Sequence, residues 1–359
     1  MNFEDLLHLL YLAYRDARKH KRNTINQLQF EKNLEHSLFT LAFELYEGSY
    51  ELSPSICFIN ELPVKREIIA ADFRDRVVHH LLYNWLYPIF DRQFIYDSYS
   101  CRIGKGTLFG INRARAFAAS ESKNFSRECF SLRLDISGFF MAINRDVLYR
   151  LIVDGVNRSH WGHLPGLVPI PDKNLCDFLI NKFVYNNPLE QARFKSPSSA
   201  WDELPPNKSL MNAGVNNGLP IGNLTSQLFG NVYLNPLDQY IKRTLKIRYY
   251  GRYVDDMLFV HRSKSVLLEI LVAVREFLNQ ELKLILNEKK TKLQPIQNGF
   301  SFLGAYILPW RMYPSRRVVK NFRNCVNSPL DDVYLQGCRM ESYLGLLKHY
   351  DASRLSLIG

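Results

Sequence analysis

Apolar side chains in the first ninety residues follow helical spacing, with one strand-like interruption. Apolar residues recur every three or four positions in three stretches. These stretches predict amphipathic helices over residues 3 to 14, 34 to 45 and 75 to 88. Pro88 is expected to end the third helix. Residues 56 to 69 predict two short strands around a proline-containing turn, and Lys65 and Arg66 make this hairpin basic.

The middle of the chain changes to strand-like alternation. In residues 131 to 140, apolar residues at 132, 134 and 136 alternate with Arg133 and Asp135, so one face is apolar and the other carries a carboxylate. Residues 186 to 217 are rich in Pro, Asn and Ser and keep no period, which indicates an insertion or a long loop. Residues 247 to 260 predict a hairpin whose tip carries Asp255 and Asp256.

Helical and strand-like segments continue to alternate around that hairpin. Thr225 or Ser226 is placed to cap one helix, and another helix is predicted over residues 266 to 278. Leucines at 282, 284 and 286 predict a further strand. Short strands alternate with helices, and no glycine-rich dinucleotide fingerprint is present. The chain is therefore predicted to be an α+β protein with an antiparallel sheet backed by helices.

Composition limits the class of protein and its compartment. Of 359 residues, 47% are hydrophobic, which excludes a disordered chain, and 46 Lys and Arg against 35 Asp and Glu give a net charge of +11. This excess favours an anionic partner, with nucleic acid first. Six scattered cysteines, no secretory signal and no apolar run long enough to cross a bilayer predict a cytoplasmic protein without membrane contact.

The acidic pair at 255 and 256 is the strongest chemical signal. Two adjacent aspartates usually mark a solvated turn, but here the flanking residues are apolar. Unpaired buried carboxylates are costly, so a cation is expected to neutralise them, with Asp135 as a third ligand. Three carboxylates can hold two Mg²⁺ ions, which suits in-line phosphoryl transfer, and Mn²⁺ could replace Mg²⁺.

A series of linked motifs between about residues 56 and 308 resembles that of reverse transcriptases. The segment YVDD at 253 to 256 resembles the YxDD box of that family, and LRLDISGFF at 132 to 140 resembles its first catalytic motif. GLPIGNLTSQ from 218 resembles the loop and helix under the incoming nucleotide. NEKKT from 287 resembles the basic motif that precedes the primer grip, and GFSFLGAYI from 299 resembles the primer grip itself. The resemblance implies an RNA-directed DNA polymerase, a nucleotidyltransferase.

The resemblance also implies roles for individual residues. Asp135, Asp255 and Asp256 would be catalytic, and Ile136 would join them as a metal ligand. Phe140 would exclude a ribose 2′-hydroxyl by steric clash. Lys65, Arg66 and the amides of Ser137, Gly138 and Phe139 would face the triphosphate, and Lys290 would protonate the leaving pyrophosphate. The nucleotide site would be completed by Ile221, Gly222 and Gln227, and the primer grip would consist of Phe302, Leu303 and Gly304.

The implied architecture is a right hand with three parts. Residues 1 to 130 would form the N-terminal helices and fingers, 131 to 308 the palm with the insertion near 186 to 217, and 309 to 359 a short helical thumb. Arg316, Arg317, Lys320 and Arg323 would hold a duplex by its phosphates. The 51 residues after the primer grip, 359 − 308, are too few for RNase H, so a bare polymerase is expected.

Two biological roles and two rival functions remain open. Ile221 replaces the polar residue of many relatives, which resembles error-prone enzymes of diversity-generating retroelements, whereas the insertion resembles elaborations of bacterial antiphage reverse transcriptases. A catalytically silent RNA-binding scaffold and a nuclease are disfavoured by the intact aspartates and by Phe140. The expected partners are a structured RNA template, the DNA product, deoxynucleoside triphosphates and an accessory protein or second subunit. His79, His80, His160 and His163 are interpreted as structural, because zinc spacing is lacking.

Overall fold

The computed structural model describes residues 1–19, 23–61, 64–159, 161, 171–327 and 333–351 of the chain. The chain forms two compact units with interleaved boundaries. The first unit comprises residues 1–95, 137–239 and 277–285. The second comprises residues 96–136, 240–276 and 286–359. The three-part subdivision into fingers, palm and thumb stays a prediction.

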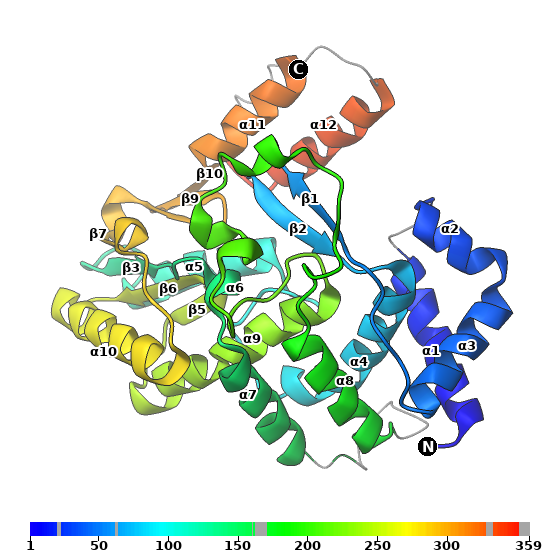
Figure 1. Cartoon of the computed structure of the whole chain (residues 1–359). Coiled ribbons are helices and arrows are strands. Elements are labelled where there is room, and N and C mark those ends of the chain that lie inside the picture. The colour runs from blue at the N-terminus through cyan, green and yellow to red at the C-terminus, as the bar shows by residue number, and fades with distance from the viewer. Residues whose placement is uncertain (20–22, 62–63, 160, 162–170, 328–332, 352–359) are drawn as a thin grey trace. The chain divides into compact units, whose positions relative to one another are not determined.

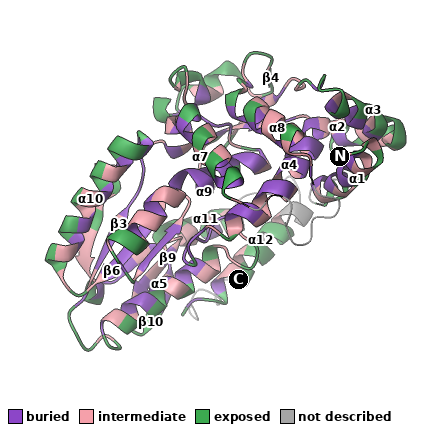
Figure 2. Ribbon diagram, turned by 90° about the horizontal axis from the view of Figure 1, so that it is seen from below, coloured by how far each residue is buried: buried purple, intermediate pink, exposed green. Residues whose placement is uncertain are grey.

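The first unit is mainly helical and is organised around two long buried helices. α4 (Phe73–Asp91) packs against α9 (Leu224–Gln239), and both helices are buried along most of their length (Figure 2). The N-terminal helices are α1 (Phe3–Arg18), α2 (Ile25–Lys32) and α3 (Leu34–Tyr46). Two of them, α1 and α2, pack against α4, and α3 packs against α1 and α2 (Figure 1). The remaining helices of this unit are α6 (Phe139–Ala142), α7 (Arg145–Asn157) and α8 (Lys173–Tyr185).

A small sheet in the first unit joins the basic hairpin to the irregular segment. β1 (Ile56–Asn60) pairs antiparallel with β2 (Arg66–Ala70), as the sequence predicts. On its other edge β1 pairs in parallel with β4 (Arg193–Phe194). The segment from 186 to 217 is otherwise built of turns and three single-turn 3-10 helices, which confirms its irregular character.

The second unit contains a four-stranded antiparallel sheet in the order β5-β6-β3-β7. Its strands are β3 (Phe130–Leu134), β5 (Tyr250–Tyr253), β6 (Asp256–His261) and β7 (Lys292–Pro295). α5 (Thr107–Glu121) packs against β5 and β6 and contributes Phe117 to the core of this unit. α10 (Lys264–Leu282) begins in the second unit and ends in the first.

The C-terminal part of the second unit adds a smaller sheet and two helices. β8 (Phe300–Phe302), β9 (Ala305–Leu308) and β10 (Arg311–Pro314) form an antiparallel meander, followed by α11 (Arg316–Asn327) and α12 (Val333–Leu347). Phe300, Phe302 and Phe322 share one apolar core with residues of α5 and β6. The predicted α+β class with an antiparallel sheet backed by helices is confirmed. No helix within the described ranges is long and apolar enough to span a bilayer.

Four local predictions are wrong in detail. α4 continues through Pro88 to Asp91, because a proline near the end of a helix removes only one hydrogen bond and buried apolar residues hold the last turn. α9 begins at Leu224, so Thr225 is inside its first turn, where it pairs with His79 at 2.8 Å instead of capping the helix. Residues 282–286 form no strand: α10 reaches Leu282, and Leu286 makes only an isolated bridge. The tip of the acidic hairpin is formed by Val254 and Asp255, because Asp256 already begins β6.

Candidate active site

The hairpin that joins β5 and β6 carries two of the three candidate catalytic carboxylates. Tyr253 pairs with Asp256, which leaves a two-residue turn of Val254 and Asp255. Val254 has φ +52°, a left-handed conformation that is unfavourable for a β-branched residue. Arg252 is fully buried, and its Nη1 donates a hydrogen bond of 2.9 Å to the Val254 carbonyl. The arginine therefore holds the strained turn in place from beneath.

The third carboxylate follows directly after the neighbouring strand. In the antiparallel pair of β3 and β6, Leu134 is opposite Met257, so one further step along each strand brings Asp135 opposite Asp256. Opposed residues in such a pair have Cα atoms about 5 Å apart. Asp135 is only 5% exposed. Both strands belong to the second unit, so one sheet brings the three aspartates together.

Crowding of the carboxylates changes their protonation. Burial, reinforced by the negative charges of Asp256 and Asp135, raises the pKa of Asp255 to about 7. Burial also raises the pKa of Asp256, where the charge of Asp135 adds to the effect and the charge of Arg133 opposes it. The Arg133 Nη2 is 3.9 Å from Asp256 Oδ1. Burial is thus the main cause of both shifts, and the charges of Lys290 and Arg317 also oppose the rise at Asp256.

Lys290 and Asn287 hold Asp135 from the opposite side. The Lys290 Nζ donates to both carboxylate oxygens of Asp135, at 2.8 and 3.0 Å. The Asn287 side chain donates to Asp135 Oδ1 at 3.2 Å, and its backbone amide donates to the Asp135 carbonyl at 2.8 Å. The lysine side chain remains 58% exposed. An ammonium group thus occupies one cation position at the carboxylates.

The backbone at Ile136 is arranged to present its carbonyl to the same place. Ile136 and Leu286 form an isolated antiparallel bridge, and the adjoining residues supply the hydrogen bond from Asn287 N to Asp135 O. In a pair of this kind the bridged residue directs its own N–H and C=O to the other side of the strand. On that side β3 pairs with β6, the strand that begins with Asp256.

The donor set fits a divalent cation. The three carboxylates and the Ile136 carbonyl are hard oxygen ligands of the kind that Mg²⁺ and Mn²⁺ prefer. Within the described ranges, no group of three or more His, Cys, Asp or Glu side chains is arranged so that it could hold a metal ion. One of the three carboxylates, Asp135, is instead paired with Lys290.

Residues 137 to 140 lie in the first unit, and the structure corrects the expected role of Ser137. The Ser137 amide donates to the Ile285 carbonyl at 2.9 Å, so it does not face a triphosphate. The Phe139 side chain is 3% exposed and packs toward Gly230 of α9, so it belongs to the core. Phe140 is half-buried, and its ring is close enough to Gly230 to fix its position.

Phe140 and Ile221 belong to one apolar cluster in the first unit. The buried members of this cluster are Cys57, Ile69, Met141 and Leu210, and its half-buried members include Phe140, Trp201 and Ile221. The Ile221 carbonyl also accepts a 2.8 Å hydrogen bond from the Ile69 amide. The structure thus brings Phe140 and Ile221 into one apolar cluster.

The other expected nucleotide ligands of the first unit have different surroundings. Lys65 Nζ is 3.2 Å from Glu203 Oε2 of the irregular segment, and Arg66 is exposed. Gly222 is exposed, and a Cβ there would lie 2.9 Å from the Ile69 carbonyl oxygen, so the close approach to β2 requires glycine. Gln227 is exposed in the first turn of α9.

The expected primer-grip residues form the turn between β8 and β9. Phe302 is 1% exposed and belongs to the core, so its side chain cannot touch a primer. Leu303 and Gly304 form the turn with φ of +50° and +88°. Among the histidines, His79 is a buried structural residue, whereas His160 and His163 lie outside the described residues.

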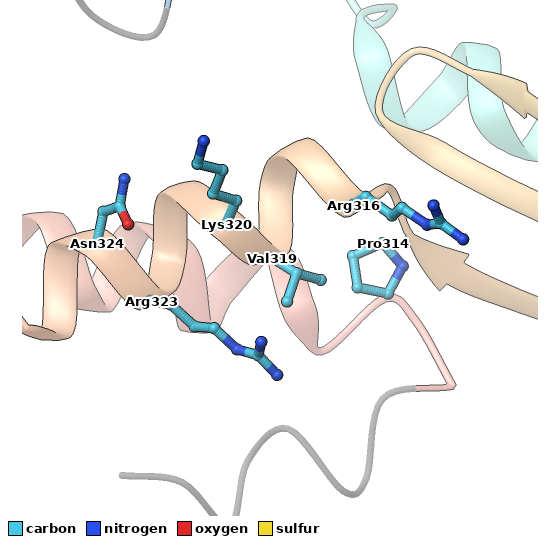
Figure 3. A pocket seen from close by; sticks show the side chains of 6 residues that line it. All are labelled: Pro314, Arg316, Val319, Lys320, Arg323 and Asn324. Atoms are coloured by element: carbon cyan, nitrogen blue, oxygen red, sulfur yellow. The ribbon is translucent and has the colours of Figure 1, made fainter.

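A basic hollow lies along α11 at the C-terminal end of the second unit. It has a volume of about 300 Å³ and is lined by Pro314, Arg316, Val319, Lys320, Arg323 and Asn324. The side chains of its three cationic residues extend away from the helix axis (Figure 3). Closely spaced cations on one helix suit the phosphates of a nucleic acid backbone.

Several residues that shape the site are not evident in the sequence. Arg252 and Glu67 lie beside the motifs and Asn287 lies within one. Only the fold shows that Arg252 holds the acidic turn, that Asn287 holds Asp135 and that Glu67 holds the irregular segment. Arg133 gives a weak signal, since it shares a strand face with Asp135 two residues later. Asn207 gives no signal, because it lies in a stretch without periodicity.

The antiparallel sheet backed by helices gives the chain the right-hand fold of polymerases. The chain is similar to apo telomerase of Candida tropicalis truncated from its C-terminal domain, with a TM-score of 0.52 and 12% identity over 74% of this chain. It is also similar to Candida albicans telomerase in complex with a TWJ fragment of telomeric RNA, with a TM-score of 0.49 and 10% identity over 89% of this chain. The chain spans 56% and 58% of those two proteins.

The sequence comparisons narrow the class. Residues 169–307 match the family described as reverse transcriptase (RNA-dependent DNA polymerase). This segment includes Asp255, Asp256 and Lys290, whereas Asp135 and Phe140 precede it. Protein YkfC of Escherichia coli strain K12 is 24% identical over 330 residues, which cover 82% of this chain and 77% of that protein. The matched residues therefore resemble part of a reverse transcriptase domain.

Proposed function

We propose that the chain copies a dedicated RNA template into DNA by metal-assisted nucleotidyl transfer at Asp135, Asp255 and Asp256. The observation that carries the proposal is the placement of three carboxylates at adjacent strand ends of one sheet. Carboxylate oxygens are ligands that divalent cations such as Mg²⁺ prefer, and the Ile136 carbonyl would add a neutral oxygen ligand. Two bound divalent ions would activate the primer 3′-hydroxyl and stabilise the leaving pyrophosphate oxygen.

The protein's own groups would position the reactants and move protons. Lys290, which now neutralises Asp135, would exchange that partner for the pyrophosphate and donate a proton to it. Arg252 would keep the Val254–Asp255 turn in its strained shape, so that both hairpin carboxylates stay aimed at one place. Phe140 would select the deoxyribose by excluding a 2′-hydroxyl. The cations of α11 would hold the template–primer duplex through its phosphates.

For the biological role we propose antiphage defence in a bacterium, in the cytoplasm, with an RNA template that the same system encodes. The support is the irregular segment from 186 to 217, which forms an ordered attachment to the β1–β2 hairpin through β4. Such an elaboration suits a polymerase adapted to one structured RNA and to an accessory protein or second subunit. A silent RNA-binding scaffold is less favoured, because all three carboxylates are retained.

A second candidate role is error-prone copying in a diversity-generating retroelement. The apolar contacts of Ile221 with the cluster around Phe140 favour it, since an apolar wall cannot hydrogen-bond the nucleotide. Replacement of Ile221 by Gln is expected to lower misincorporation several-fold when primer-extension products are sequenced. An unchanged error rate would count against this candidate.

The decisive experiment is to sequence the DNA that co-purifies with the wild-type chain and with Asp255→Ala. The wild type is expected to yield DNA complementary to one RNA, and its sequence would identify template, primer and fidelity together. The variant is expected to yield none, because one carboxylate of the hairpin is lost. Equal recovery of DNA from both proteins would refute catalysis by this chain.

A further inference from the structure

The irregular segment is attached to the basic hairpin by a buried carboxylate. Glu67 of β2 is 1% exposed and accepts three hydrogen bonds of 2.7 Å, from Trp201 Nε1, Ser209 Oγ and the Leu210 amide. A buried carboxylate is costly unless its oxygens are hydrogen-bonded. The three bonds therefore fix both ends of the stretch from 201 to 210 against β2.

The same stretch forms the back of the apolar cluster around Phe140 and Ile221. Trp201 and Leu210 belong to that cluster, and Leu210 is buried. Two of the three residues that Glu67 holds by hydrogen bonds are thus also packed behind the side chains expected to form the nucleotide pocket. Displacement of the stretch would remove part of the packing that holds Phe140 in position.

Between its two fixed ends, the stretch reaches the turn that leads to Phe140. A 3-10 helix over Pro206–Lys208 places the Asn207 amide Nδ2 at 3.3 Å from Ser137 Oγ. The Asn207 carbonyl oxygen lies 2.5 Å from where a Cβ on Gly138 would be, so the two backbones are in direct contact. Asn207 and Lys208 are exposed.

We propose that Asn207 is a specificity-determining residue of the nucleotide site, which hydrogen-bonds the incoming deoxynucleoside triphosphate, and that Glu67 is its positioning residue. The inference rests on the proposed polymerase function. An amide side chain donates and accepts at once, so Asn207 can hold Ser137 with its NH₂ group and offer its oxygen to the nucleotide. The irregular segment is then a wall of the pocket that selects the nucleotide.

The test compares the wild type with Asn207→Ala, Glu67→Gln and the control Asn187→Ala. Asn187 is an exposed residue of the same segment, and among the described residues its side chain bonds its neighbours Leu189 and Glu190. Single-nucleotide incorporation on a template–primer is expected to show a KM for dNTP raised about three- to tenfold in Asn207→Ala, as for one lost hydrogen bond, with kcat within twofold. Glu67→Gln should raise KM similarly, and Asn187→Ala should leave it unchanged.

Protection from trypsin gives a second measurement that does not depend on turnover. Cleavage after Lys208 should be slowed by dNTP in the wild type, less so in Asn207→Ala, and should be faster in Glu67→Gln even without nucleotide. The inference would be overturned if the KM of Asn207→Ala stayed within twofold of the control, or if dNTP did not change the rate of cleavage. In either case, incorporation by the wild type would still support the proposed polymerase function. Absence of any incorporation by the wild type would refute the proposed function itself and the inference with it.

Discussion

Replacement of Gly138 by Ala tests the contact between the irregular segment and the turn before Phe140. Gly138 has φ +55°, and a Cβ there would lie 2.5 Å from the Asn207 carbonyl oxygen and 3.2 Å from Asn207 Cβ. The left-handed conformation costs an alanine about 1–2 kcal/mol. Displacement of a packed backbone by about 1 Å adds about 1–3 kcal/mol. The total expected loss of stability is about 2–5 kcal/mol.

Gly48→Ala is the matched control, because it separates the two costs. Gly48 also lies in the first unit and has φ +71°, but no atom lies within 4 Å of its added Cβ. Its loss should therefore be about 1–2 kcal/mol, from conformation alone. Urea unfolding followed by tryptophan fluorescence measures both variants against the wild type. Equal losses would show that Asn207 does not pack on Gly138 and would refute the reasoning.

Three further predictions concern sugar selection, duplex binding and pH. Phe140→Ala is expected to admit ribonucleotides in primer extension with rNTPs. An unchanged preference for dNTPs over rNTPs would contradict the steric role. Lys320→Ala or Arg323→Ala should weaken template–primer binding and reduce the magnitude of the slope of log K against log[salt] by about 1. An unaltered slope would show that these residues do not contact the phosphates of the duplex. Burial raises the pKa of Asp75 to about 6, so its contribution to stability is complete below about pH 4 and is lost as the pH rises through 6. The wild type should therefore gain about 1 kcal/mol more than Asp75→Asn between pH 8 and pH 5 in urea unfolding, and parallel pH profiles would exclude this linkage.

Some elements are predicted correctly from the sequence and others are not. The difference depends on how far apart in the chain the interacting residues are. Helices α1 and α3, the β1–β2 hairpin and the β5–β6 hairpin follow from local periodicity, which acts over a few residues. α2 was not predicted, since its sequence has no apolar stripe. The predicted helix end at Pro88 is wrong, because the burial of neighbouring apolar residues in α4 outweighs the loss of one hydrogen bond.

The sequence by itself determined which residues could do chemistry. The aspartates at 135, 255 and 256 are recognisable from apolar flanks and from the order of motifs along the chain, and so are Phe140 and Ile221. Only the tertiary structure decided how charge is distributed among them. The pairing of Lys290 with Asp135 joins residues 155 positions apart, and the support of the acidic turn by Arg252 depends on burial that no local pattern records.

The irregular segment shows the same division most clearly. Its composition determined that it would be neither helix nor strand, because proline, asparagine and serine favour turns. Its attachment through Glu67 and the contact of Asn207 with Gly138 depend on backbone and side-chain atoms 142, 143 and about 70 positions apart in sequence. Hydrogen bonds between such distant groups form only after the chain has folded, so their partners can be read from the fold and not from the sequence.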